Sequence, residues 1–404
     1  MVPDDLTLPA GTRLLHIGPH KTGTTALQSA FHLARGRLAA HGVVYAGAGR
    51  SPVRATLAIT GRPAMLGEAG PDMAYWDQLV REVHEAGDQR VVISSEFFDE
   101  AGDAVARRVV ADLGGPRVHV VVTLRPLARI LPSQWQQYLQ NGLRTPYLEW
   151  LDGILRKPLD GRPTPLFWQR HRHDKLIARW AAAAGAQNVT VIVVDGSDRL
   201  VLLRTFESLL GLPAGFLVPG NDVVNRSLTL AEAEVVRQLN EEFKRREWPA
   251  ASYAKFMRYG AVRQMKARRP LPGEPQIATP AWALERVAEI SAEMTRNIAG
   301  LGVRVIGDLA ALSSPATPAR QPETGVGDVP VDPVVPVEAA AIPVEAAAQA
   351  VLGAILAGGM ADQAAAVDRR AVADRPVREV DARRLAGVLV RRGRQRMRRA
   401  LRPG

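Results

Sequence analysis

A short segment rich in glycine and threonine, HIGPHKTGTTALQ at residues 16–28, contains the residue types that bind phosphate groups. Lys21 offers a full positive charge, and Gly23 lets the backbone come close to a ligand. A helix that starts here would add unpaired backbone N–H groups and the positive end of its dipole. The alternative is an ordinary strand-to-helix turn, but the position after an apolar run favours an anion-binding loop. Hydroxyl donors are present at Thr22, Thr24 and Thr25.

The order of residues in this loop differs from the common triphosphate-binding loop, G-x-x-x-x-G-K-[ST]. That loop has its lysine after the last glycine, whereas Lys21 here precedes Gly23. The segment therefore predicts a phosphate site of another kind.

A second candidate anion site lies about 100 residues further on, in VVVTLRPLARILPSQWQQY. Arg125 ends the apolar run VHVVVTL, and Ser133 follows eight residues later. Pro126 suits the first turn of a helix, because its missing N–H would have no partner there. Either residue alone is more often a surface group, but their joint spacing after a strand indicates a binding pair.

Both motifs resemble those of sulfotransferases that use 3′-phosphoadenosine 5′-phosphosulfate (PAPS). In that family a lysine before Gly-Thr-Thr belongs to the loop that binds the 5′-phosphosulfate. An arginine at a strand end and a serine eight residues on bind the 3′-phosphate. The resemblance extends over residues 13 to about 300 and implies PAPS as the sulfuryl donor, with no metal required. It implies catalysis by Lys21 and a cofactor site of Lys21, Thr22, Gly23, Thr24, Thr25, Arg125 and Ser133.

The resemblance also implies a general base, a histidine or a glutamate, for the acceptor hydroxyl or amine. Carbohydrate and tyrosine sulfotransferases often have a glutamate after the second strand, but VVYAGAGRSPVRATLAITG has neither residue type here. Glu96, at the end of RVVISSE, is the first candidate, and an acidic helix cap is its alternative. His20 is the second candidate. We expect His16 to be buried in the first strand and HRH at 171–173 to lie on a solvated helix face.

The pattern of apolar residues predicts a three-layer α/β fold with a central parallel sheet, whose phosphate-binding loop follows strand one. Short apolar runs rich in valine and isoleucine alternate with longer amphipathic stretches, as in buried parallel strands and their covering helices. We predict strands at 13–17, 42–46, 90–95, 118–124 and 189–194. We predict helices at about 24–40, 74–87, 99–113, 127–141, 166–185, 228–246 and 279–301.

Composition changes near residue 313, which divides the chain into three predicted parts. Residues 1–312 form the sulfotransferase domain, and 313–343 read as a linker rich in Pro, Ala and Val. Residues 344–404 form an Ala-rich and then Arg-rich tail, with helical potential; its last 24 residues hold nine arginines and one aspartate. Two readings of this tail stay open, a solvated basic segment and an amphipathic helix on an anionic membrane.

The remaining composition narrows the classes of function. The 404 residues include no cysteine, which excludes disulfides, thiolate metal sites and thiol nucleophiles, and no His/Asp/Glu cluster has metal-ligand spacing. A net charge of +11 suits an anionic ligand. Only 5% of residues are aromatic and no nucleic-acid module is recognisable, so we expect no nucleic-acid partner. Without a signal peptide pattern, we expect a cytoplasmic protein.

Two other functions stay open at this stage. A kinase or NTPase with a deviant loop would need an aspartate to hold Mg²⁺ after a core strand, and Asp195 after VTVIVV is the candidate. A degenerate nucleotide-binding scaffold is the other alternative, although Lys21, Arg125 and Ser133 are all present. For a sulfotransferase, the acceptor could be a carbohydrate, a glycolipid or a small metabolite.

Overall fold

The computed structural model describes residues 6–63, 70–156, 163–196, 198, 200–220, 226–313 and 343–358. The chain forms two compact units. Of the described residues, the larger unit holds those up to Arg245 and those between Pro270 and Ser313, and it carries the predicted site. The smaller unit combines Arg246–Arg269 with residues 343–358.

A six-stranded parallel sheet is the centre of the larger unit, with strand order β2-β3-β1-β4-β5-β6. All five predicted strands are present, which confirms the parallel α/β fold. The sixth strand was not predicted, because three residues at the edge of a sheet carry too little pattern. The strands are β1 (Arg13–His16), β2 (Val43–Tyr45), β3 (Arg90–Ser94), β4 (Val118–Leu124), β5 (Val189–Val193) and β6 (Arg304–Ile306).

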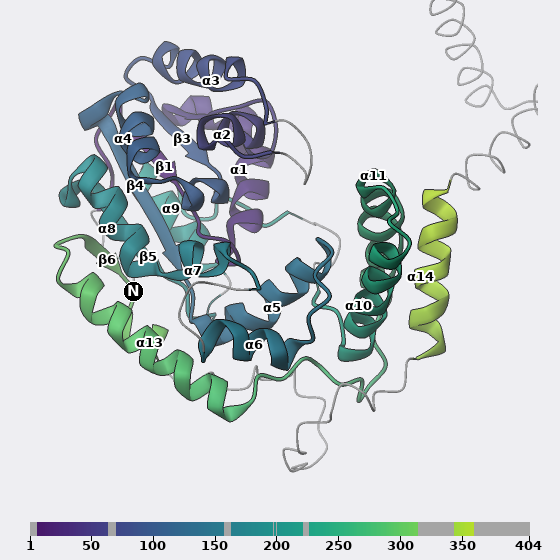
Figure 1. Cartoon of the computed structure of the whole chain (residues 1–404). Helices are drawn as coiled ribbons and strands as arrows, with labels where there is room; N and C mark the ends of the chain where they lie inside the picture. Colours follow the sequence, from purple (N-terminus) through teal and green to yellow (C-terminus); the bar gives the residue numbers. More distant parts are fainter. Residues whose placement is uncertain are drawn as a thin grey trace, which may run out of the picture. The chain divides into compact units, whose positions relative to one another are not determined.

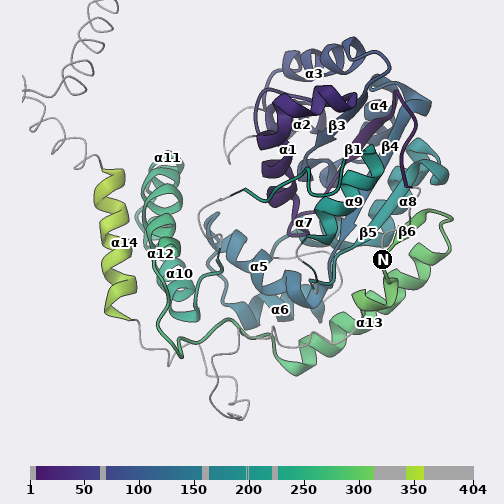
Figure 2. The same ribbon diagram turned by 180° about the vertical axis from the view of Figure 1, so that it is seen from behind.

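Helices cover both faces of this sheet, and they form the outer two of the three layers (Figures 1 and 2). Alternate strand residues point to opposite faces, so Leu14 and Leu15 belong to different apolar clusters. One face packs against α1 (Thr24–Leu38) and α9 (Val201–Leu210). The other face packs against α2 (Val53–Thr60), α3 (Ala74–Glu85), α4 (Asp103–Asp112), α8 (His173–Ala184) and α13 (Ala281–Ala299).

Two helix predictions were wrong in detail. The stretch 166–185 is not one helix, because the backbone of Arg172 (φ −77°, ψ 77°) separates α7 (Leu166–His171) from α8. The helix predicted from residue 99 begins at Asp103, and the residues before it form a short 3₁₀ helix, η2 (Glu96–Glu100). The remaining helices of the larger unit are α5 (Leu127–Leu139), α6 (Tyr147–Leu155) and α10 (Leu230–Arg245), with 3₁₀ turns η1 (Ala39–His41), η3 (Gly115–Arg117), η4 (Ala186–Asn188) and η6 (Leu309–Leu312).

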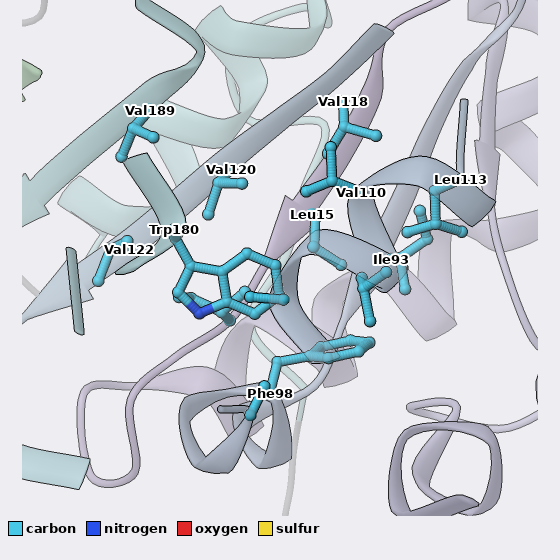
Figure 3. Packing of buried hydrophobic residues seen from close by; sticks show 14 of the residues in the cluster. Leu15, Ile93, Phe98, Val110, Leu113, Val118, Val120, Val122, Trp180 and Val189 are labelled. Atoms are coloured by element: carbon cyan, nitrogen blue, oxygen red, sulfur yellow. The ribbon is translucent and has the colours of Figure 1, made fainter. Parts of the chain in front are cut away.

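Phe98 anchors η2 to the core. Its ring is fully buried and lies 6.2 Å from the Trp180 ring, centroid to centroid, in an edge-to-face arrangement (Figure 3). Burying an aromatic ring of this size stabilises the fold by several kcal/mol at about 25 cal/mol per Å². Because Phe98 is fixed in the core, the polar residues of η2 have fixed positions at the carboxyl ends of the strands.

The smaller unit is helical in the part that the structure describes. It contains α11 (Ala250–Tyr253), a π-helix η5 (Ala254–Ala261), α12 (Val262–Ala267) and α14 (Val344–Ala357). The helix α14 lies within the tail predicted to begin at residue 344. The predicted linker lies outside the described residues except at its two ends, as does the arginine-rich end of the tail. No helix among the described residues is both long and apolar enough to cross a membrane.

Candidate functional site

The two predicted anion-binding motifs follow neighbouring strands. The loop leaves β1, Arg125 leaves β4, and these strands pair directly in the sheet. The chain continues from β1 toward one edge of the sheet and from β4 toward the other, so they flank a topological switch point. Ligands of open α/β sheets bind in the crevice that such a switch creates at the carboxyl ends of the strands.

The loop is fixed to β4 by hydrogen bonds to Thr123. The Thr123 backbone N–H donates to the Gly18 carbonyl (2.8 Å), and the Thr123 hydroxyl lies 2.7 Å from that of Thr22. Thr22 also donates to the Pro19 carbonyl (2.7 Å), and its side chain is almost fully buried. The Thr22 hydroxyl therefore stabilises the conformation of the loop from its buried side.

His16 lies beneath this loop, buried in β1 as expected. Its ring nitrogens lie 2.8 Å from the Ser94 hydroxyl and 3.2 Å from the Thr123 hydroxyl. Burial lowers the pKa of His16 to about 3, so the ring is neutral at neutral pH. It is a structural residue that links β1 to both neighbouring strands.

The backbone at the lysine adopts a conformation that is unfavourable for this residue type. Lys21 has φ 70°, in the left-handed region that side chains other than glycine seldom enter. Strained residues of this kind concentrate at functional sites, where the surrounding structure enforces them. The Lys21 ammonium is directed to α5 and donates to the Gln137 side-chain carbonyl at 3.0 Å.

The start of α1 offers the features of an anion site. Gly23 precedes it with φ 100°, no side chain caps its first N–H groups, and its first turn contains no acidic residue. The backbone N–H groups there and the helix dipole are consequently available to an anion. Thr24 is buried with its hydroxyl unpartnered, and Thr25 is exposed.

Arg125 lies just before α5 and Ser133 in its second turn, and both are partly buried. Burial and the positive charge of Arg129 lower the pKa of Arg125. No carboxylate among the described residues forms an ion pair with Arg125. Two partly buried guanidinium groups that lie close together attract an anion strongly when no carboxylate pairs with them. This observation fits a phosphate group at the position that the sequence motif predicted.

The two candidates for the base have different environments. Glu96 is partly buried at the start of η2, and its carboxylate accepts from the Gln28 amide at 3.1 Å. A side chain at Gly18 would come within 3.1 Å of the Glu96 Cα, so the loop passes directly over this residue.

His20 is held by Asp99, which sequence reasoning did not identify. One Asp99 carboxylate oxygen lies 2.7 Å from His20 Nδ1 and 3.1 Å from its backbone nitrogen. A carboxylate only accepts, so Nδ1 carries a proton, and Nε2 makes no hydrogen bond to the described residues. Asp99 is fully buried whereas the His20 side chain is 13% exposed, so the imidazole reaches from a fixed anchor toward the surface. Phe97 packs edge-on against the ring at 5.3 Å.

The prediction for the HRH segment was wrong, since both histidines are buried rather than solvated. Both ring nitrogens of His171 lack a hydrogen-bond partner, as does Nε2 of His173. Burial lowers the pKa of His171 well below its usual value, and the neighbouring charges of Lys21 and Arg170 contribute. The prediction assumed one helical stretch, whereas α7 ends at His171 and α8 begins at His173, with both rings in the interior.

No metal site is evident in the part of the chain that the structure describes, where no three His, Asp or Glu residues come together in a suitable group. Asp195, the candidate for holding Mg²⁺, follows β5 and is partly buried there.

Comparisons with known proteins give only distant similarity, to solved structures. No family model and no curated protein sequence matches the chain. The crystal structure of a sulfotransferase from Alicyclobacillus acidocaldarius resembles the chain with 15% sequence identity and a TM-score of 0.39. The match covers 61% of this chain and 95% of that one. An identity and a TM-score this low do not establish a shared activity.

Proposed function

We propose that this protein is a sulfotransferase that uses PAPS as its sulfuryl donor. The observation that carries the proposal is the position of two candidate anion sites after neighbouring strands, the Lys21 loop after β1 and Arg125 after β4. No carboxylate of the described residues forms an ion pair with Arg125. A nucleotide with phosphate groups on both its 5′ and 3′ positions needs two such sites. A nucleoside triphosphate needs only one.

The residues present fit the donor. Lys21 and the N–H groups at Gly23, Thr24 and Thr25 would hold the 5′-phosphosulfate, and Arg125 with Ser133 would hold the 3′-phosphate. When bound, PAPS supplies an activated sulfuryl group whose sulfur–oxygen bond to the 5′-phosphate breaks as the acceptor oxygen bonds to sulfur. Lys21 and the helix start would stabilise the negative charge that grows on the phosphate oxygen. Positioning and charge stabilisation supply most of the catalysis in such in-line transfers.

We assign the general base to His20, oriented by Asp99. His20 Nε2 makes no hydrogen bond to the described residues, and His20 lies one residue from Lys21 and reaches toward the surface. It would accept the proton that the acceptor hydroxyl or amine loses. Glu96, the other candidate, is held by Gln28 and covered by the loop at Gly18, which favours a role in shaping the loop.

Nucleotide binding tests the proposal. Calorimetric titration of the purified chain with PAP, the desulfonated product, and with ADP and ATP should show tight PAP binding that does not depend on Mg²⁺. ADP lacks the 3′-phosphate and should bind more weakly. Tight, Mg²⁺-dependent ATP binding would instead favour a kinase or NTPase, and equal affinities for PAP and ADP would contradict the assignment of Arg125 and Ser133.

A further inference from the structure

We propose that a buried set of polar side chains next to Lys21 binds the acceptor, and that the acceptor is an uncharged compound rich in hydroxyl groups. This inference rests on the proposed function. The set, called here the polar cluster, consists of Gln134 and Tyr138 on α5 and His171 on α7.

The polar cluster is unusual because its hydrogen-bonding atoms have no partners among the described residues. Both amide atoms of Gln134, the hydroxyl of Tyr138 and both ring nitrogens of His171 are buried and form no hydrogen bond there. The Tyr138 hydroxyl lies close enough to the Gln134 amide and the Arg170 guanidinium for both to favour its ionised form. Neither contact, however, has the distance and angles of a formed hydrogen bond. Each such group costs stability in a folded protein, so a concentration of them calls for a ligand or for water that satisfies them.

The cluster lies next to the reacting groups. Lys21 is hydrogen-bonded to Gln137, which is on the same stretch of α5 as Gln134 and Tyr138. Gln134 and Tyr138 are four residues apart and therefore share a face of the helix. His171 lies near both groups, because after burial the electrostatic influence of His20 and of Lys21 contributes to the lowered pKa of its ring. An acceptor held by the cluster would thus present a hydroxyl group to the lysine and the proposed base.

The chemistry of the cluster indicates an uncharged ligand. The Gln134 amide carries no charge, burial keeps the His171 imidazole neutral, and burial raises the pKa of the Tyr138 phenol. The nearby Arg170 is already paired, because it donates to the Glu100 carboxylate. Neutral groups that both donate and accept match the hydroxyl groups of a sugar, whereas an anionic acceptor would need an unpaired cation.

Thermal unfolding separates a ligand site from a structural network, because the chain contains matched controls. Gln136 is also buried on α5, but its side-chain carbonyl accepts from the Leu228 backbone N–H at 2.8 Å. Tyr147 is also a buried tyrosine, but its hydroxyl pairs with that of Thr279 at 2.7 Å. Gln136→Met and Tyr147→Phe leave a partner unsatisfied, so each should lower the Tm by about 2 °C or more.

For variants of the polar cluster we expect no such fall in Tm. Gln134→Met and Tyr138→Phe remove groups without partners, so the Tm of the ligand-free protein should stay unchanged or rise. A fall in Tm equal to that of the control variants would overturn the proposal, because internal waters would then satisfy these groups as part of the fold.

Sugar binding completes the test. With PAP present, glucose, N-acetylglucosamine, trehalose and maltose are titrated separately by thermal shift. At least one should raise the Tm of the wild-type protein and of Tyr147→Phe, and this shift should be lost in Tyr138→Phe and Gln134→Met. If none of the four shifts the wild-type Tm, a neutral sugar acceptor is contradicted. Failure of PAP itself to bind would instead contradict the proposed donor, and the comparison of Tm values would be unaffected.

Discussion

The donor side and the acceptor side of the proposed site are built in different ways. The donor side consists of two continuous motifs, each directly after a strand of the sheet, and its geometry is set by β1 and β4. The acceptor side is assembled from three separate elements, with Asp99 on η2, Tyr138 on α5 and His171 on α7. Phosphate binding needs backbone N–H groups in a fixed arrangement, which a strand-to-helix turn provides. Acceptor binding needs separate side chains, which can come from any element that reaches the crevice.

The largest loss of activity should come from Lys21, where the donor side and the acceptor side meet. Lys21→Ala removes the charge that stabilises the phosphate oxygen in the transition state. We expect kcat for sulfuryl transfer from PAPS to fall by about 10²–10³-fold, with a smaller loss of PAP affinity. Steady-state kinetics with PAPS and titration with PAP measure the two quantities. A variant that loses affinity but keeps its kcat would make Lys21 a binding residue only.

The second largest loss of kcat is expected at the general base, and it distinguishes the two candidates, His20 and Glu96. His20→Gln keeps an amide N–H that can donate to Asp99 but cannot accept a proton at neutral pH. We expect kcat to fall by about 10²-fold while PAP affinity stays within a few-fold of wild type. The matched variant Glu96→Gln should retain most of its kcat, because Glu96 is held beneath the loop. The reverse result, with Glu96→Gln inactive and His20→Gln active, would return the role to Glu96.

A smaller effect, on PAP affinity, is expected from a substitution on the donor side. Ser133→Ala removes one hydroxyl from the proposed 3′-phosphate site while Arg125 remains. One hydrogen bond contributes about 0.5–1.5 kcal/mol, so PAP affinity should fall by about 2- to 12-fold with ADP affinity unchanged. An equal loss for PAP and ADP would show that Ser133 acts on the structure of α5 rather than on the 3′-phosphate.

The same contrast explains what could be predicted from the sequence. The parallel sheet, the loop and the position of Arg125 follow from local patterns, because valine-rich runs and a Lys-Thr-Gly-Thr-Thr turn each indicate their own structure. Asp99 could not be predicted, because its role depends on Phe98, which fixes η2 in the core. His171 was expected on a solvated face because residues 166–185 were predicted as one helix, whereas α7 ends at His171 and α8 begins at His173. Tyr138 carries no motif, so only its contacts reveal it.

The most direct measurement of the central claim is the ratio of PAP to ADP affinity in two proteins, wild type and Arg125→Ala. The claim is that Arg125 recognises a 3′-phosphate, which PAP carries and ADP lacks, since both phosphates of ADP are at the 5′ position. Isothermal titration should give a wild-type protein that prefers PAP by about 1.5–3 kcal/mol, or about 10- to 150-fold, and a variant in which most of this preference is lost. A preference for PAP that survives in Arg125→Ala, or one that is absent from the wild type, would contradict the account.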